Sequence, residues 1–400
     1  MKRYCSVLLA CSLILVPVLA QAAQFAVVGP RALGMGGASV AAVNDSTAVY
    51  WNPAALANSR KVDIRIPAGV AVRDYMDIKN NWDRIQVIQD AVNAGDYAAA
   101  TELKKLFLDL DRPDAVTNID VSGGILVSFP VSSSAFALSA LGIGFAELRP
   151  TVDTFHLNTA PSITDSIALN NSAIGAFGIV TVEPAISFAT SLGDHVLVGA
   201  NAKMVYASTF LHSALTRSGN FNNFVSDMNN SETKSHKGSI DAGILFKPMS
   251  GLDIGVVGRY LNSPSFPIAG MAAVKNGAGD VMIAPVSAGE IEIKPQYRAG
   301  VAWKPFDNLT LSADYDLTKN KSFTESTEDQ TIAGGIELTM LSEILTLRAG
   351  AYKNTANDLA NVVYTAGLGL RVFALRIDLA GAYDFKEQEA QASASLALRF

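Results

Sequence analysis

Seven charged side chains are placed where they could form ion pairs, on the polar face of segments that alternate between apolar and polar residues. They are Asp63, Arg65, Arg298, Asp314, Asp316, Arg376 and Asp378. We expect Arg298 to pair with Asp314 and Asp316, and the other four to meet one another. Because a cation facing lipid at the bilayer midplane costs about 2–4 kcal/mol, these charges must face water or packed polar groups. The pattern predicts a structural polar network, with direct substrate contact as the alternative.

Side chains that could carry catalysis or bind a metal are sparse. The chain has four histidines, which are His156, His195, His212 and His236. None has a spacing to another that is typical of metal ligands, so we expect no metal site. The sequence contains no nucleophile-elbow motif, which argues against a serine hydrolase. We therefore expect no enzyme activity and no cofactor, and an outer-membrane lipid hydrolase stays the least favoured alternative.

Composition separates the remaining classes of protein. The 400 residues have a net charge of −6 and no basic runs, which argues against binding to nucleic acid. Mean hydropathy is +0.24, although only 17% of the residues are charged. No stretch after the N-terminus reaches the 18 or so apolar residues that a membrane-spanning helix needs. This combination favours either a large apolar core or a membrane β-barrel, in contact with membrane lipid.

The N-terminus has the pattern of a secretory signal peptide. Lys2 and Arg3 precede an apolar run, and Ala20-Gln21-Ala22 offers a cleavage site. We expect residues 1–22 to be removed. Since Cys5 and Cys11 both lie in this segment, the mature chain would have no thiol for a disulfide or a nucleophile.

The strongest pattern is a two-residue alternation of apolar and polar side chains, which is typical of strands. It recurs in fourteen segments, near 61–73, 118–130, 134–148, 173–190, 195–210, 237–249, 252–263, 290–304, 308–319, 327–340, 344–353, 361–372, 374–386 and 390–400. Short turns alternate with longer links, and the chain ends in an alternating strand that closes with Phe400. An even strand count with this spacing predicts an all-β, 14-stranded antiparallel transmembrane barrel in the bacterial outer membrane, spanning residues 58–400.

The first long link, 74–117, differs from the others in its periodicity. Ile85 and Ile88 are spaced for one helical face, and Leu103 and Phe107 for another. We predict two short amphipathic helices in this extracellular loop, whose apolar faces pack on one another or, alternatively, capture an apolar ligand. The later links 151–171 and 213–236 are rich in Ser, Thr and Asn, so we expect them to be solvated.

Residues 23–57 precede the first strand and are rich in small side chains. Their motif residues are Gly34, Gly36, Gly37, Asn44, Asp45, Asn52, Pro53 and Ala54. The glycines lack the preceding strand and the following lysine of a nucleotide-binding loop. Small residues instead suit a compact plug in a tight space, because glycine lets two backbones approach closely.

The motifs RALGMGG and WNPAAL in this stretch resemble those of the FadL/TodX family of outer-membrane transporters for long-chain fatty acids and other hydrophobic compounds. TraF-like and PorV-like proteins share much the same motifs. The resemblance implies that residues 23–57 form a hatch inside the barrel and that a hydrophobic small molecule crosses passively through extracellular loops, lumen and hatch. The alternative is an accessory barrel for secretion or conjugation, which would bind a protein partner at its extracellular loops.

Overall fold

The computed structural model describes residues 25–77, 81, 84, 87–88, 91, 94–112, 115–215, 224–269, 274–275, 281–283, 289–321, 328–358, 360–386 and 389–400. The expected signal peptide lies outside the described residues. No helix within the described part of the chain is long and apolar enough to cross a membrane.

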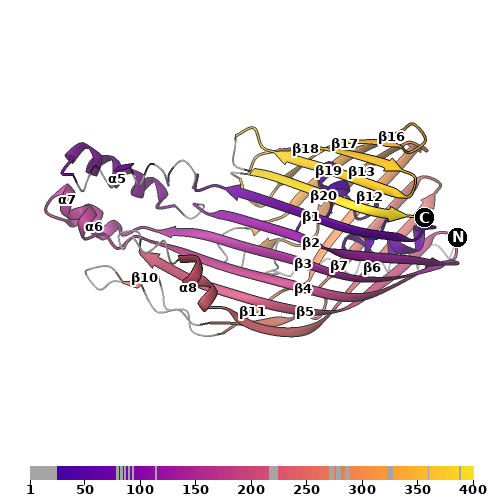
Figure 1. Cartoon of the computed structure of the whole chain (residues 1–400), viewed down its shortest axis with the longest axis horizontal. Coiled ribbons are helices and arrows are strands. Elements are labelled where there is room, and N and C mark those ends of the chain that lie inside the picture. Colours follow the sequence, from indigo (N-terminus) through magenta and orange to yellow (C-terminus); the bar gives the residue numbers. More distant parts are fainter. Residues whose placement is uncertain are drawn as a thin grey trace, which may run out of the picture.

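Among the described residues, fourteen antiparallel strands form a closed barrel (Figure 1). They are β1 (Asp63–Asp74), β2 (Thr117–Val131), β3 (Ser134–Thr151), β4 (Ala173–Leu192), β5 (Val196–Leu215), β6 (Thr233–Met249), β7 (Leu252–Arg259), β12 (Gln296–Phe306), β13 (Leu309–Asp316), β16 (Thr331–Met340), β17 (Leu345–Asn354), β18 (Val363–Val372), β19 (Leu375–Tyr383) and β20 (Glu389–Arg399). The last strand closes the barrel by pairing with the first, so that Asp63 lies opposite Arg399. The predicted fold class is confirmed.

Three short hairpins lie outside the barrel order. They are β8 (Ser265–Ile268) with β11 (Gly289–Glu292), β9 (Val274–Lys275) with β10 (Val281–Ile283), and β14 (Asn320–Lys321) with β15 (Glu328–Asp329). The predicted strand 290–304 is therefore wrong at its start, since residues 290–292 pair with β8 and the barrel strand begins at Gln296. Pro295, which has no N–H to donate to a ladder, lies between the two.

The outer surface of the barrel is apolar. Large side chains exposed along the strands include Ile66, Val121, Leu138, Ile186, Ile244, Val301, Leu347, Leu379 and Leu396. The alternating inward positions are mostly buried. This is the surface of a barrel in lipid, and the short turns of such barrels lie in the periplasm. The end that carries the C-terminus in Figure 1 is thus periplasmic, and the opposite end is extracellular.

The wall of the barrel is uneven in height. Strand β5 has 20 residues, whereas β7 and β13 each have 8. The long strands reach the helices at the extracellular end in Figure 1. Within β4, Pro184 interrupts the pairing with β5, but Val182–Tyr206 and Ala185–Lys203 keep the same register on either side. Pro184 therefore marks missing ladder bonds rather than a bulge.

The extracellular end carries helices α5 (Tyr97–Leu110), α6 (Thr154–Thr159), α7 (Ile163–Ala168) and α8 (Phe224–Asn230). Asp96 caps α5 by accepting hydrogen bonds from the Ala98 and Ala99 amides. Leu157 of α6 is buried in a cluster with α5, so the link 151–171 is solvated only in part. Polar residues of this link also bond to one another: the backbone amides of His156 and Asn171 donate hydrogen bonds to the buried Asp153 carboxylate.

Residues 25–58, here called the N-terminal segment, are almost entirely buried and fill the lumen toward its periplasmic end. They contain helices α2 (Pro30–Gly34) and α3 (Ala48–Trp51) and the 3₁₀ helix η1 (Pro53–Asn58). Helix α2 contacts β17 to β20, whereas η1 contacts β2 to β6. The segment therefore touches opposite parts of the barrel wall.

Candidate functional site

Met35 and Gly36, here called the tip of the N-terminal segment, pack directly on the backbone of the wall. A methyl group on Gly335 would lie 2.4 Å from the Met35 carbonyl oxygen, and one on Gly350 would lie 2.5 Å from the Gly36 nitrogen. Gly36 itself has φ of +70°, which favours glycine. Gly36, Gly335 and Gly350 thus lack side chains where the backbones of the segment and the wall are in direct contact.

Two other glycines of the predicted motif also lie against the wall or in a turn. Gly34 precedes the tip, and a methyl group on it would lie 3.1 Å from the Arg348 Cβ atom. Gly37 has φ of +87° and follows the tip. These glycines thus allow close packing and tight turns of the backbone, and their spacing does not indicate a phosphate-binding loop.

Asn52, Pro53 and Ala54 fix the other side of the segment. The Asn52 side-chain amide donates to the carbonyls of Val40 and Ile244, at 3.1 and 3.2 Å, and its oxygen accepts from the Ala54 amide at 3.1 Å. Pro53 occupies the first turn of η1, where its missing N–H costs nothing. Asn52 thus ties one turn of the segment both to itself and to β6.

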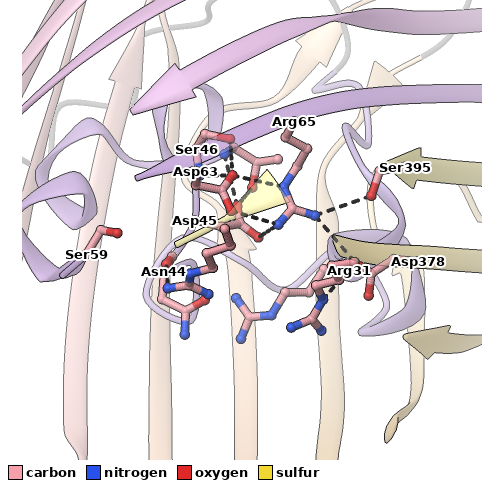
Figure 2. A network of polar contacts seen from close by, with 12 residues as sticks. Arg31, Asn44, Asp45, Ser46, Ser59, Asp63, Arg65, Asp378 and Ser395 are labelled. Carbon is pink, nitrogen blue, oxygen red and sulfur yellow. Dashed lines mark hydrogen bonds and ion pairs between the residues drawn. The ribbon is translucent and has the colours of Figure 1, made fainter. Parts of the chain in front are cut away.

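A buried polar network joins the segment to the seam of the barrel (Figure 2). The Arg65 guanidinium lies 3.2 Å from Asp63, 3.4 Å from Asp45 and 3.4 Å from Asp378. Asp63 in turn accepts hydrogen bonds from the amide and hydroxyl of Ser46. Burial raises the pKa of the Asp45 carboxyl, but attraction to Arg65 and Arg31 outweighs burial and holds that pKa below its usual range.

The network continues along helix α2 through residues that the sequence analysis did not select. Arg31 donates two hydrogen bonds to Glu337, at 2.8 and 2.7 Å, and a third to the Ala42 carbonyl. Arg348 bridges Glu337 and Asp378, at 2.7 and 2.9 Å. Arg376 also binds Asp378, at 2.9 Å. A bidentate guanidinium–carboxylate pair is a geometrically specific contact, so Arg31 fixes α2 in one position.

Arg298 pairs with only one of its two expected partners. Its guanidinium binds Asp316, while Asp314 accepts the backbone amides of Ser39 and Val40 at 2.7 and 2.9 Å. Asp314 therefore holds the N-terminal segment directly, and the expected Arg298–Asp314 pair is replaced by these two bonds.

Aromatic residues of the segment pack on cations of the wall. Phe25 stacks on Trp51 and meets Tyr50 edge-on. The Arg298 guanidinium lies 4.1 Å from the Phe25 ring centroid, and that of Arg259 lies 3.9 Å from Tyr50. Such cation–π contacts add attraction inside a desolvated lumen. Burial also raises the pKa of Tyr50 to about 12, so its hydroxyl stays neutral and donates to the Ala26 carbonyl.

A second buried ionic cluster lies beside Tyr50 and was also not selected from the sequence. Lys203 binds Glu183 at 2.9 Å and Asp241 at 3.1 Å, and the Tyr260 hydroxyl donates to Glu183. These charged residues stand at inward positions of β4, β5 and β6. In the sequence, these residues could have been selected because they alternate with outward-facing apolar residues.

The residues proposed for apolar capture have buried side chains where they are described. Ile88, Leu103 and Phe107 pack in one cluster with Leu157, and Ile85 lies outside the described residues. Among the described residues, no group of three or more His, Cys, Asp or Glu side chains is arranged to hold a metal ion.

A chamber of about 70 Å³ lies on the extracellular side of the N-terminal segment. Phe25, Val27 and Leu33 contribute to its lining, together with polar groups such as Arg73 and Asp120. Drug-sized ligands occupy sites of about 300–1,000 Å³, so this chamber is too small for one.

The sequence matches the family described as "F plasmid transfer operon, TraF, protein" over residues 49–316, which is more than half of the chain. The chain belongs to this TraF family. No curated protein matches it significantly. The matched stretch includes Asn52, Pro53 and Ala54 and the first nine of the fourteen barrel strands, β1 to β7, β12 and β13.

Solved structures of similar fold cover nearly the whole chain. The toluene transporter TbuX of Ralstonia pickettii is 15% identical, with a TM-score of 0.55 over 93% of this chain and 97% of its own. The P. putida toluene transporter TodX is 13% identical, with a TM-score of 0.55 over 93% and 98%. A Pseudomonas aeruginosa FadL homologue is 14% identical, with a TM-score of 0.54 over 95% and 99%. The resemblance to FadL/TodX barrels is confirmed for the fold, and the chain is an outer-membrane barrel.

Proposed function

We propose that the chain is an outer-membrane channel for the passive uptake of hydrophobic small molecules, such as long-chain fatty acids or aromatic hydrocarbons. The observation that carries this proposal is an apolar cluster on the inner wall of the extracellular half, which an inward-folded loop covers in this state. Phe177 and Ile179 of β4 and Val205 of β5 face inward and form one cluster with Phe266 and Ile293. A general porin has a polar, water-filled lumen instead.

An apolar inner wall suits an apolar solute because of the solute's cost in water. Each methylene that leaves water contributes about 0.8 kcal/mol, so an apolar solute gains by entering early. The names of the similar structures, which include two toluene transporters, support the same class of solute.

In this proposal the N-terminal segment acts as the hatch. It is anchored by Arg31, Asp45 and Asn52 on different parts of the wall, and the chamber above it has a volume of only about 70 Å³. A solute larger than a few waters can pass only if the segment or the adjacent loops move, or if it leaves through the wall.

The edge between β6 and β7 is a candidate for a lateral exit. Pairing between these strands reaches no higher than Ala242 and Gly258, although β6 continues up to Thr233. Above this level the Asn262 side chain bridges to β6, with its amide donating to the Gly238 carbonyl at 2.8 Å. The Leu261 amide also donates to the Ile240 carbonyl at 2.9 Å. One backbone bond and one side chain thus replace strand pairing at this point of the wall.

The test is uptake of a panel of labelled hydrophobic compounds by otherwise identical cells with and without the gene. Faster accumulation of at least one compound, restored by the wild-type chain, is expected. A labelled sugar serves as the control for general leakage, and its uptake should not change. Equal rates over the whole panel would overturn the proposal.

A second candidate is an accessory barrel for conjugation or secretion, which the membership of the TraF family favours. The packed helices α5 and α6 at the extracellular end would then bind a protein partner. Co-purification in mild detergent distinguishes the two, because a stoichiometric partner is expected of an accessory barrel and not of a passive channel.

A further inference from the structure

Cations at the periplasmic mouth of the barrel, unlike those deeper in the lumen, make no ion pairs with carboxylates among the described residues. Inside the lumen, Arg31, Arg65 and Arg298 each bind a carboxylate. Five cations line one cavity at the mouth: Arg60, Lys61, Lys247, Lys304 and Arg399. Within the described part of the chain, none of the five has a carboxylate within ion-pairing distance. Asp253 is the acidic residue in the same lining.

The contacts that these cations do make are with neutral groups. Lys247 donates to the Asn58 side-chain oxygen, Arg60 to the Ser132 carbonyl, and Arg399 to the Asn44 carbonyl at 2.9 Å. The Arg399 Nε atom is buried and has no hydrogen-bond partner among the described atoms. Neutral acceptors satisfy hydrogen bonds but do not neutralise charge, so a positive potential remains at the mouth.

The cavity is open to the periplasm and closed above. Ala42, Val43 and Asn44 of the N-terminal segment line it, and its volume is about 290 Å³. A second cavity of about 640 Å³ shares Asn44, Lys304 and Arg399 with it. Asp307, Glu337 and Glu343 also line the second cavity, together with Arg31 and Arg376. The two spaces form one vestibule beneath the N-terminal segment, whose lining holds seven cations and four carboxylates and is therefore basic.

We propose that this vestibule binds an acidic peptide segment of a periplasmic protein. The cations are distributed around a mouth much larger than one phosphate ion, which fits several carboxylates on one chain better than a single small anion. Lys247, Lys304 and Arg399 occupy inward positions of β6, β12 and β20, so phosphates of the surrounding lipid do not reach them. The proposal does not depend on the transport function, because the N-terminal segment separates the vestibule from the chamber.

The experiment measures binding of a fluorescent polyglutamate peptide to the whole purified protein in a neutral detergent, with polyglutamine of equal length as the control peptide. We expect polyglutamate to bind more tightly and its affinity to fall with rising salt, because salt screens exposed charges. In the combined variant Lys61→Gln, Lys247→Gln and Lys304→Gln, affinity should fall roughly tenfold, as expected for the loss of three exposed ion pairs.

The matched control removes the same number of charges at the extracellular end, through Lys104→Gln, Lys105→Gln and Lys237→Gln. Folding of both variants is checked by the heat-dependent shift of the barrel on gels. The proposal is overturned if both variants lose affinity equally, if the two peptides bind alike, or if the periplasmic variant binds as tightly as wild type. Competition by inorganic phosphate at the same total negative charge would also overturn it, since the vestibule would then be a small-anion site.

Discussion

Arg65 is the residue on which the contact between the N-terminal segment and the barrel seam depends. It is 2% exposed and lies among three carboxylates, Asp45, Asp63 and Asp378. Removing one member of a buried ionic group leaves the others charged without compensation, and this loss costs more than the net value of the pair.

We therefore expect Arg65→Met to lower the free energy of unfolding by about 3–5 kcal/mol. Arg84→Met is the control, because the Arg84–Glu102 pair is about half exposed and its loss should cost less than about 1 kcal/mol. Urea titration of the two variants, followed by loss of the folded band on gels, makes the comparison. Equal destabilisation by both would contradict the assigned role of Arg65.

The protonation of Asp45 gives a prediction in pH. Because its folded pKa is depressed, Asp45 stabilises the folded state above its unfolded pKa of about 3.9, and this contribution is lost as the pH falls through the folded pKa. We expect conductance of reconstituted barrels to stay low from about pH 8 to about pH 5 and to rise only in stronger acid. A rise between pH 7 and about pH 5 would mean that a carboxyl other than Asp45, such as Asp314, controls the position of the segment.

At the scale of elements, the contact between the segment tip and strands β16 and β17 is the most sensitive to volume. Gly335→Ala would place a methyl group 2.4 Å from the Met35 oxygen, whereas in Gly334→Ala the nearest atom would be 3.8 Å away. Only the first change should displace the tip and raise the conductance of planar bilayers. If neighbouring Gly334→Ala raised it as much, displacement of the tip would not be the cause.

The sequence predicted the barrel strands well because one face of each strand meets lipid and the other meets the lumen. The alternation of Leu309 to Thr318 follows directly from this geometry. The prediction from this alternation failed at 290–304. There Ile291 and Ile293 continue the pattern of the barrel strand but belong to the inward-folded loop that covers Phe177. A period of two cannot tell a barrel strand from a hairpin lying against it.

The network was predicted only in part, because its pairs are far apart in the sequence. Sequence position placed Asp63, Arg65 and Asp378 at the same seam, but Asp45 was selected by its motif and not as their partner. Arg31 and Glu337 make a bidentate pair but were missed, because 306 positions separate them in the sequence. The residues of the N-terminal segment and their wall partners meet only once the barrel has closed.

At the scale of the whole molecule, a closed barrel holds a buried segment, an apolar inner wall above it and a basic vestibule below it. The chamber directly above the segment has a volume of only about 70 Å³. The account therefore requires an apolar ligand to bind on the extracellular side of the N-terminal segment before anything moves.

The most direct measurement is an experimental density map of the protein purified from its own membranes with native lipids. The account predicts elongated apolar density beside Phe25 or the inner wall at Phe177, with the N-terminal segment in place. A stoichiometric protein partner on a barrel whose lumen holds only its own N-terminal segment would contradict it and favour the accessory role.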